Sequence, residues 1–249
     1  CRLAIVGPTA ERIARAKAVA SRGEPWRGRD DLWFSARGLA SEGGKVAFLF
    51  PGVDASFAPR VDDVAERFAR PCPIPPDTAS LKGLGLGIIA VGRLFDGVLR
   101  DLGVVPDMMA GHSIGEWSGM VAAGIIDDAA IGAFMATLQP GANRIADVRY
   151  VACGTGRERI EPLFADLPGV VVTHDNCHHQ SIMCVPAAME ADVTARLRAQ
   201  RVLFEVLPFR SGFHSPALAP HVDFYAAHLA RLALGAPRVP LWSATTCAP

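Results

Sequence analysis

The residues best placed to do chemistry are a serine and its flanking glycines, in the segment 111–115 (Gly-His-Ser-Ile-Gly). The pattern G-x-S-x-G is typical of a serine raised on a sharp turn between a strand and a helix. Glycines leave room for such a turn, and the first N–H groups of the helix point at whatever the serine attacks. The pattern predicts a nucleophile at Ser113, although taken alone it is also compatible with an ordinary turn.

A serine hydroxyl is a poor nucleophile unless a base takes its proton during the attack. Of the seven histidines, His214 is the best candidate, because the segment 212–216 (Gly-Phe-His-Ser-Pro) lies where two parts of the chain meet. Binding clefts form preferentially at such junctions. The sequence therefore predicts a Ser113–His214 pair.

A second cluster, residues 174–179 (His-Asp-Asn-Cys-His-His), could suggest a metal site. Zinc ligands usually come from separated positions that converge on one ion. Here all the candidates share one predicted hairpin turn, and no second cluster follows along the chain. We therefore expect no metal.

The elements around Ser113 have an α/β order. The apolar run 45–50, ended by Pro51 and Gly52, predicts a buried strand of a parallel sheet that is covered on both faces. Helical spacing follows at 60–70 and 84–102, and a short apolar run precedes Ser113. Alternating strands and helices of this kind favour a parallel sheet.

The pattern changes from Tyr150 onward. The spacing predicts four strands and two helices in the order βαββαβ, at 150–153, 157–164, 170–173, 181–185, 189–200 and 202–206. This is the order of a split-βαβ, ferredoxin-like module. The α/β pattern resumes with a helix at 215–232 and a strand at 239–243. We therefore expect the module to be inserted into the α/β part of the chain.

The first four dozen residues resemble a small flanking module. A strand is expected at 3–7 and a helix at 9–21, with Thr9 as its N-cap, followed by a short strand at 32–35. The chain begins without an initiator Met, which suggests an excised piece of a longer protein.

Composition excludes several partners. The 249 residues carry 25 basic and 25 acidic side chains, which gives no support for nucleic acid or an anionic membrane. No apolar run approaches the length of a bilayer span, and no signal-like segment opens the chain. Six scattered cysteines without a C-x-x-C pair indicate reduced thiols, so the cytoplasm is expected.

Three motifs together resemble malonyl-type acyltransferases of fatty-acid and polyketide synthases. They are Phe-Pro-Gly at 50–52, Gly-His-Ser-Ile-Gly-Glu at 111–116 and Gly-Phe-His-Ser-Pro at 212–216, in the order of that family. The segment 240–246 is similar to the family's late strand. The N-terminal module resembles the linker between ketosynthase and acyltransferase. The residues that fill the motifs resemble most closely those of iterative type I synthases of the enediyne kind.

The resemblance implies a fold with three parts. These are an α/β-hydrolase-like catalytic subdomain with a parallel sheet and nucleophile elbow, an inserted ferredoxin-like subdomain, and a small N-terminal α/β linker module. The expected boundaries are 1–44 for the linker module, 45–145 and 208–249 for the catalytic subdomain, and 146–207 for the insert. The last catalytic segment is expected to be truncated.

The resemblance also implies a ping-pong mechanism. Ser113, deprotonated by His214, would take a malonyl group from CoA, and the phosphopantetheine thiol of an acyl carrier protein would then accept it. The backbone N–H groups of Val53 and Ile114 would form the oxyanion hole. No cofactor is expected in the domain itself. Malonyl-CoA, the carrier protein and a neighbouring ketosynthase domain are the implied partners, with no nucleic acid and no membrane.

The residues expected to bind the acyl group differ from those of the family. Malonyl-selective relatives place an Arg near the end of the second helix after the elbow, whereas the aligned stretch 134–140 has no cation. A buried carboxylate needs a charged partner, and Arg210, then Arg144, are the replacement candidates. If the chain before His214 is extended, residues 210, 212 and 214 share a face.

Further residues complete the implied binding site. They are Phe213, whose ring would crowd a methyl branch on the acyl group, together with His112 and Asn176. Other interpretations stay open: a serine hydrolase or thioesterase with the same elbow, an acyltransferase for a non-malonyl group, and an inactive scaffold.

Overall fold

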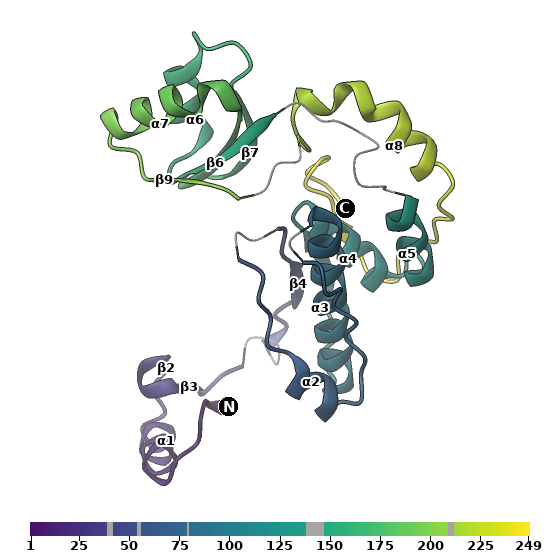
Figure 1. Ribbon diagram of the computed structural model, residues 1–249. Coiled ribbons are helices and arrows are strands. Elements are labelled where there is room, and N and C mark those ends of the chain that lie inside the picture. The colour runs from purple at the N-terminus through teal and green to yellow at the C-terminus, as the bar shows by residue number, and fades with distance from the viewer. Residues whose placement is uncertain (39–41, 54–55, 79, 138–146, 209–211) are drawn as a thin grey trace.

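The computed structural model describes residues 1–249 apart from 39–41, 54–55, 79, 138–146 and 209–211. The described strands form three sheets, two of three strands and one of four. Figure 1 shows the N-terminal sheet at one end, the helices α3 and α4 in the middle, and the four-stranded sheet at the other end.

The N-terminal sheet is antiparallel in the order β1-β3-β2 and is covered by one helix. Its elements are β1 (Arg2–Ile5), α1 (Ala10–Arg22), β2 (Trp26–Arg27), η1 (Arg29–Asp31) and β3 (Leu32–Ser35). The Thr9 side chain accepts a hydrogen bond from the Arg12 N–H, as an N-cap should, and Gly23 ends the helix in the left-handed conformation. The predicted cap and the strand at 32–35 are confirmed.

The central sheet is parallel in the order β10-β5-β4, and it carries the elbow. Its elements are β4 (Ala47–Phe50), α2 (Asp62–Arg67), α3 (Leu81–Asp101), β5 (Met108–Gly111), α4 (Ile114–Ala123), α5 (Asp128–Thr137) and β10 (Leu241–Trp242). Phe48, Phe50 and Met109 are buried on one face of this sheet, in one cluster with Ala122 and Ala123 of α4. The predicted α/β fold class is confirmed.

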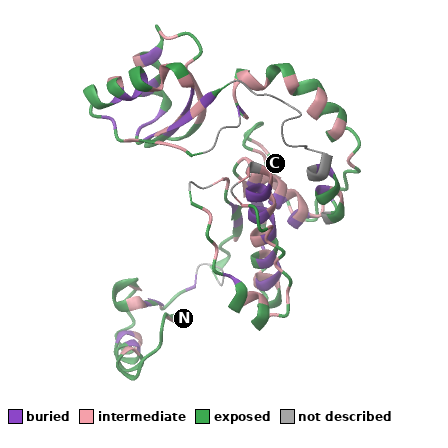
Figure 2. Cartoon of the chain, in the orientation of Figure 1, coloured by how far each residue is buried: buried purple, intermediate pink, exposed green. Residues whose placement is uncertain are grey.

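The opposite face of this sheet is open among the described residues. Leu49 of β4 is 76% exposed and Trp242 of β10 is 39% exposed, and both pair in register with Ala110 of β5. Buried and exposed residues alternate along β4, and Figure 2 shows buried residues gathered along the central helices. Successive side chains of a strand point to opposite faces, so this row cannot reach the helices that bury Phe48 and Phe50. The prediction of a sheet covered on both faces was wrong for the described residues.

The four-stranded sheet has the predicted ferredoxin-like order. Its elements are β6 (Val148–Cys153), α6 (Arg157–Ile160), η3 (Glu161–Phe164), β7 (Val171–Cys177), β8 (Gln180–Pro186), η4 (Ala187–Met189), α7 (Glu190–Ala199) and β9 (Phe204–Val206). All its pairs are antiparallel, in the order β7-β8-β6-β9. Val151 and Met183 of the sheet are fully buried in one cluster with Ile160 and Leu197 of the helices.

Two differences from the predicted element boundaries lie close to the site. Strand β7 continues to Cys177, because His174 and Asp175 pair with β8 across two register irregularities, and the turn is correspondingly short. The helix expected at 215–232 is η5 (Pro216–His221) followed by α8 (Val222–Leu229). Pro220 has no N–H to give to a continuous helix, so the first turns take the tighter form. Among the described residues, we find no helix with the length and apolar character needed to cross a bilayer.

Candidate active site

The G-x-S-x-G segment forms a sharp strand-to-helix turn. Strand β5 ends at Gly111, α4 begins at Ile114, and Ser113 between them has φ 55° and ψ −118°. A Cβ on Gly111 would lie 2.2 Å from the Gly115 carbonyl carbon, and a Cβ on Gly115 would lie 2.2 Å from the Phe50 oxygen. Both glycines are therefore required by backbone contacts, and the turn holds Ser113 in a strained conformation typical of functional sites.

Ser113 lies beside His214, a residue 101 positions away in the sequence. The Ser113 Oγ and His214 Nε2 atoms are 2.7 Å apart, which is hydrogen-bond distance. The structure thus brings together a serine, which can act as a nucleophile, and a histidine, which can take its proton.

A tight turn presents His214 to the serine. Gly212 and His214 both have positive φ, 65° and 60°, and the Ser215 hydroxyl donates to the Gly212 oxygen at 2.7 Å. Tyr150 of β6 donates its hydroxyl to the Phe213 oxygen, which ties this turn to the ferredoxin-like sheet. The backbone from 212 to 214 is therefore not extended, and the expectation that residues 212 and 214 share a strand face was wrong.

Both candidate cations for an acyl carboxylate, Arg210 and Arg144, lie outside the described residues.

The surroundings of His214 favour its neutral form. Burial lowers the pKa of His214, the nearby His112 lowers it further, and Glu116 acts in the opposite direction. A base must be unprotonated to accept the serine proton, so a lowered pKa keeps His214 competent at more acidic pH. The Glu116 carboxylate itself accepts a hydrogen bond from the Ala244 N–H at 3.1 Å, and so joins α4 to the segment after β10.

The segment that follows β4 approaches the elbow closely. Phe50 pairs with Gly111 across the sheet, so the segment after β4 runs beside the elbow. A Cβ on Gly52 would lie 2.5 Å from His112 Nδ1, which shows how closely this segment approaches. Val53 follows Gly52 in this segment, and Ile114 is the first residue of α4. Free N–H groups at a helix start can stabilise a developing oxyanion.

His112 and Asn176 touch each other across the two subdomains. His112 Nε2 is 3.0 Å from Asn176 Oδ1, and the Asn176 amide donates to Gln180 Oε1 at 3.0 Å. The Gln180 contact orients the amide so that its oxygen faces His112, and His112 must then carry its proton on Nε2. The hairpin thereby holds the side chain next to Ser113.

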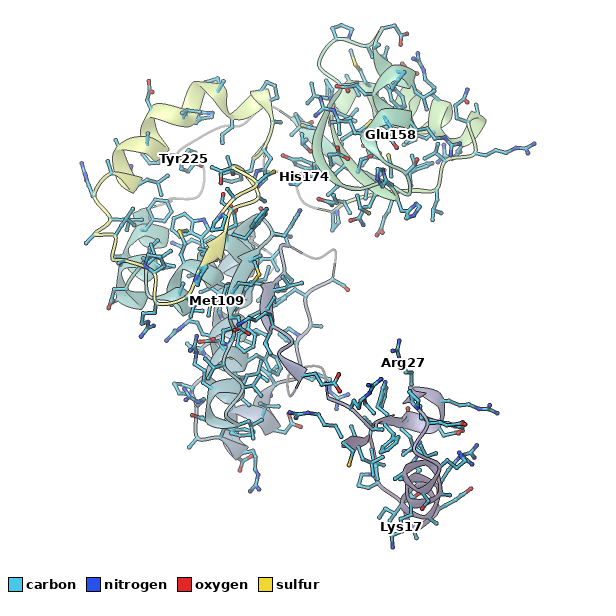
Figure 3. The ribbon with its side chains drawn as sticks, turned by 180° about the vertical axis from the view of Figure 1, so that it is seen from behind. Lys17, Arg27, Met109, Glu158, His174 and Tyr225 are labelled. Carbon is cyan, nitrogen blue, oxygen red and sulfur yellow. The ribbon has the colours of Figure 1, made fainter. Side chains whose placement is uncertain are left out.

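His174 is a site residue that the sequence reasoning missed. Its ring centroid lies 4.8 Å from that of His214 and 5.4 Å from that of His112. In Figure 3 it projects from the ferredoxin-like sheet toward the rest of the chain. A strand prediction that reached Cys177 would have placed His174 in the sheet rather than in a turn.

Phe213 is half-buried, and its ring lies 5.5 Å from the ring of Tyr225 on α8. This contact packs Phe213, the residue before His214, against α8.

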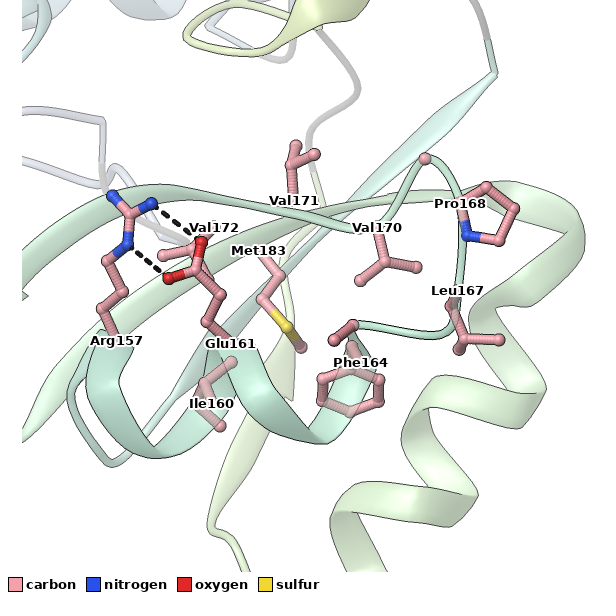
Figure 4. Close-up of a pocket in the computed structure, with 12 residues that line it drawn as sticks. Arg157, Ile160, Glu161, Phe164, Leu167, Pro168, Val170, Val171, Val172 and Met183 are labelled. Atoms are coloured by element: carbon pink, nitrogen blue, oxygen red, sulfur yellow. Dashed lines mark hydrogen bonds and ion pairs between the residues drawn. The ribbon is translucent and has the colours of Figure 1, made fainter.

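A pocket of about 480 Å³ lies elsewhere, between η3 and β7 (Figure 4). The Arg157–Glu161 ion pair lines one part of it, and neither Ser113 nor His214 does. Because Ser113 and His214 lie at the elbow, the candidate active site is there rather than at this pocket. Within the described part of the chain, no group of three His, Cys, Asp or Glu side chains is arranged to hold a metal ion.

The fold is similar to that of acyltransferases of polyketide and fatty-acid synthesis. The chain superimposes on the acyltransferase domain of the iterative polyketide synthase in enediyne biosynthesis with a TM-score of 0.69 and 23% identity, covering 96% of this chain and 58% of that one. At this identity the likeness shows the fold alone.

Sequence comparison points to the same class. The chain is 28% identical, over 98% of its length, to the phenolphthiocerol synthesis polyketide synthase type I Pks15/1 of Mycobacterium bovis, and spans 12% of it. It is 29% identical, over 59% of its length, to the malonyl CoA-acyl carrier protein transacylase of Synechocystis, and spans 50% of it. No family model matches the chain. The predicted resemblance to acyltransferase domains of polyketide synthases is confirmed, and the linker and enediyne assignments stay predictions.

Proposed function

We propose that this chain is an acyltransferase that moves a malonyl group from CoA to the phosphopantetheine thiol of an acyl carrier protein. The observation that carries the proposal is the 2.7 Å contact between Ser113 Oγ and His214 Nε2 at a strained elbow. The polyketide synthase and transacylase relatives support the choice of reaction over other uses of a serine nucleophile.

In the first half-reaction, Ser113 Oγ attacks the thioester carbonyl while His214 Nε2 takes the hydroxyl proton. The carbonyl oxygen becomes an oxyanion facing the N–H groups of Val53 and Ile114. Each such donor typically contributes about 3 kcal/mol to transition-state stabilisation. When the C–S bond breaks, the proton on His214 passes to the departing CoA sulfur, and malonyl-Ser113 remains.

The second half-reaction reverses the roles. The carrier-protein thiol gives its proton to His214 and its sulfur attacks the malonyl ester. Collapse of the tetrahedral intermediate returns the proton to Ser113 Oγ and releases the malonyl thioester. The chemistry needs no cofactor beyond the CoA thioester and the phosphopantetheine arm of the partner.

The malonyl carboxylate needs a cation, and we assign this role first to Arg210 and second to Arg144. Arg210 is four residues before the catalytic histidine, and a guanidinium binds a carboxylate through two hydrogen bonds. Replacing Arg210 with Ala should raise KM for malonyl-CoA at least tenfold and leave acetyl-CoA unaffected. Equal KM values for the wild type and Arg210→Ala would remove Arg210 from the role.

The deciding experiment is intact-protein mass spectrometry after incubation with malonyl-, methylmalonyl- and acetyl-CoA. We expect a malonyl adduct on the wild type and none on Ser113→Ala or His214→Ala. Absence of any adduct on the wild type would favour an inactive scaffold.

Adding a carrier protein then separates transfer from hydrolysis. An acyltransferase delivers the malonyl group to the carrier thiol, whereas a hydrolase or thioesterase of the same fold releases free acid. An adduct with acetyl-CoA alone would indicate a non-malonyl acyltransferase.

The chain spans a small part of its polyketide synthase relatives, 12% of the M. bovis enzyme. We propose that residues 1–44 act as a linker to a ketosynthase domain of the same polypeptide. The insert would span 146–207, with the catalytic subdomain at 45–145 and from 208 onward, and the enzyme would work in the cytoplasm. The mass of the parent polypeptide, measured by sedimentation, would test whether a ketosynthase domain shares the chain. Its localisation in the cell would test the cytoplasmic assignment.

A further inference from the structure

The side chain of His112 lies between two segments that are far apart in the sequence. Its backbone N–H donates to the Phe50 oxygen at 3.0 Å, and a Cβ on Gly52 would lie 2.5 Å from its Nδ1 atom. The Nδ1 edge of the ring therefore packs directly on the segment that leads from β4 to Val53. The opposite edge faces the insert, where Nε2 is 3.0 Å from Asn176 Oδ1.

Gln180 decides which atom of the Asn176 amide faces this ring. An amide can offer either its oxygen or its nitrogen to a histidine, and the histidine tautomer then follows. Asn176 Nδ2 donates to Gln180 Oε1 at 3.0 Å, which leaves Oδ1 to accept from His112 Nε2–H. Asn176 lies near the end of β7 and Gln180 begins β8, so the short turn between the two strands holds the pair together.

The tautomer of His112 matters for its contact with Gly52. With the proton on Nε2, the atom that packs on Gly52 is a nitrogen without hydrogen. A proton on Nδ1 would point at a place where even a Cβ of Gly52 does not fit, so the ring or the segment would have to move. Val53 is the next residue, and its N–H is one of the two that we assign to the oxyanion. A misplacement of about 1 Å can cost about 100-fold in rate.

We propose that Gln180 is a positioning residue of the active site, which acts through Asn176 and the His112 ring to hold the Gly52–Val53 segment in place. The insert then shapes the oxyanion hole without giving an N–H to it. This inference rests on the proposed function for its catalytic consequence. A donor placed for the transition state raises the rate at saturation, whereas a residue that merely binds the CoA ester lowers KM.

The first test compares two replacements of Gln180 in single-turnover malonylation of Ser113. Methionine keeps the length of the side chain without the amide, and glutamate keeps an oxygen that accepts from Asn176. At saturating malonyl-CoA we expect Gln180→Met to be about tenfold slower than the wild type, since losing an oxyanion donor outright costs about 10²- to 10³-fold. The half-saturating concentration should stay within about twofold. Gln180→Glu should recover most of the rate.

Three results of this comparison would overturn the proposal. They are a wild-type rate in Gln180→Met, a change in the half-saturating concentration alone, and equal rates for the two variants. Gln200 is the matched control in the same subdomain, because it is exposed after α7 and is bonded to Arg196 and Arg159 through its backbone. Gln200→Met and Gln200→Glu should both malonylate at the wild-type rate.

A double-mutant cycle tests whether Gln180 acts through His112. His112→Ala removes the ring that Asn176 holds, so we expect slow malonylation and no further loss when Gln180→Met is added. Losses that multiply, or a wild-type rate in His112→Ala, would overturn the proposal, since Gln180 would then act by another route.

The last test needs no substrate. With ¹⁵N-labelled histidine, NMR should show the His112 proton on Nε2, with slowed exchange into water because Asn176 accepts it. Exchange should be faster in Gln180→Met and slow again in Gln180→Glu. A proton on Nδ1 of His112 in the wild type would overturn the proposal even if no variant folds. If this pattern is seen but no CoA ester acylates Ser113, the proposed function fails and the positioning of His112 stands.

Discussion

At the scale of single residues, the site combines two side chains held in uncommon backbone conformations. Ser113 and His214 both have positive φ, 55° and 60°, which side chains with a Cβ adopt at a cost of about 1–3 kcal/mol. Such strain persists only where surrounding contacts enforce it. Gly111 and Gly115 do this for the serine, and the Ser215–Gly212 hydrogen bond does it for the histidine.

Substrate choice is a prediction at the same scale. Phe213 precedes His214, and we expect its ring to crowd an α-methyl group on the acyl chain. Phe213→Ser should therefore relax selectivity toward methylmalonyl-CoA by about 10-fold, since one methyl is worth about 1–3 kcal/mol in a pocket. A competition assay with both CoA esters measures the ratio. An unchanged ratio would mean that Phe213 serves mainly to pack against Tyr225.

At the scale of elements, the elbow depends on α4 lying directly against the end of β4. Gly115→Ala would put a Cβ 2.2 Å from the Phe50 carbonyl, where no flexible side chain can yield. We expect a loss of about 3 kcal/mol in unfolding free energy and loss of malonylation. Gly132→Ala on α5 is the control, because nothing lies within 4 Å of its Cβ. Equal denaturant midpoints for the two variants would contradict this.

The turn that carries His214 depends on the insert. Tyr150 is buried on β6 and donates to the Phe213 oxygen. Tyr150→Phe should remove this hydrogen bond, at a cost of about 1 kcal/mol, and slow malonylation by about fivefold. Tyr225→Phe keeps the ring that packs on Phe213 and should behave as the wild type. Single-turnover rates compare the two, and equal rates would show that the insert does not hold the turn.

At the scale of the whole molecule, folding buries the ring of His174 from the insert and disfavours its charged form. The pKa of His174 falls to about 4 when the chain folds, whereas an unfolded histidine titrates near 6.5. Above about pH 6.5 the ring is neutral in both states and folding is unaffected. Below that pH the unfolded state binds a proton that the folded state does not, so stability falls until about pH 4.

We therefore expect the unfolding free energy to fall with decreasing pH across this window. One group contributes at most about 1.4 kcal/mol per pH unit, and less here because the ring keeps some solvent contact. Urea titrations at several pH values measure the slope, which should be shallower in His174→Gln. The exposed His178, beside Glu158, provides the control His178→Gln. Identical slopes in all three proteins would contradict the assignment.

The sequence by itself determined the elements and the chemistry of the site. The spacing of apolar residues predicted the ferredoxin-like order, because alternating and helical periods follow from backbone geometry alone. The glycines around Ser113 predicted the elbow, because only a residue without a Cβ fits there. The motif 212–216 identified His214 through its residue types and its place at a junction.

Only the tertiary structure decided which residues of the insert lie near the elbow at Ser113. His174 became visible when β7 continued past Thr173, since pairing with β8 overrode a polar run that resembles a turn. The open face of the central sheet at Leu49 could not be predicted from the sequence. A continuous apolar run is compatible with a strand covered on one face and with a strand covered on both. Hydrogen-bond partners such as Asn176 for His112 depend on distances between residues far apart in the chain.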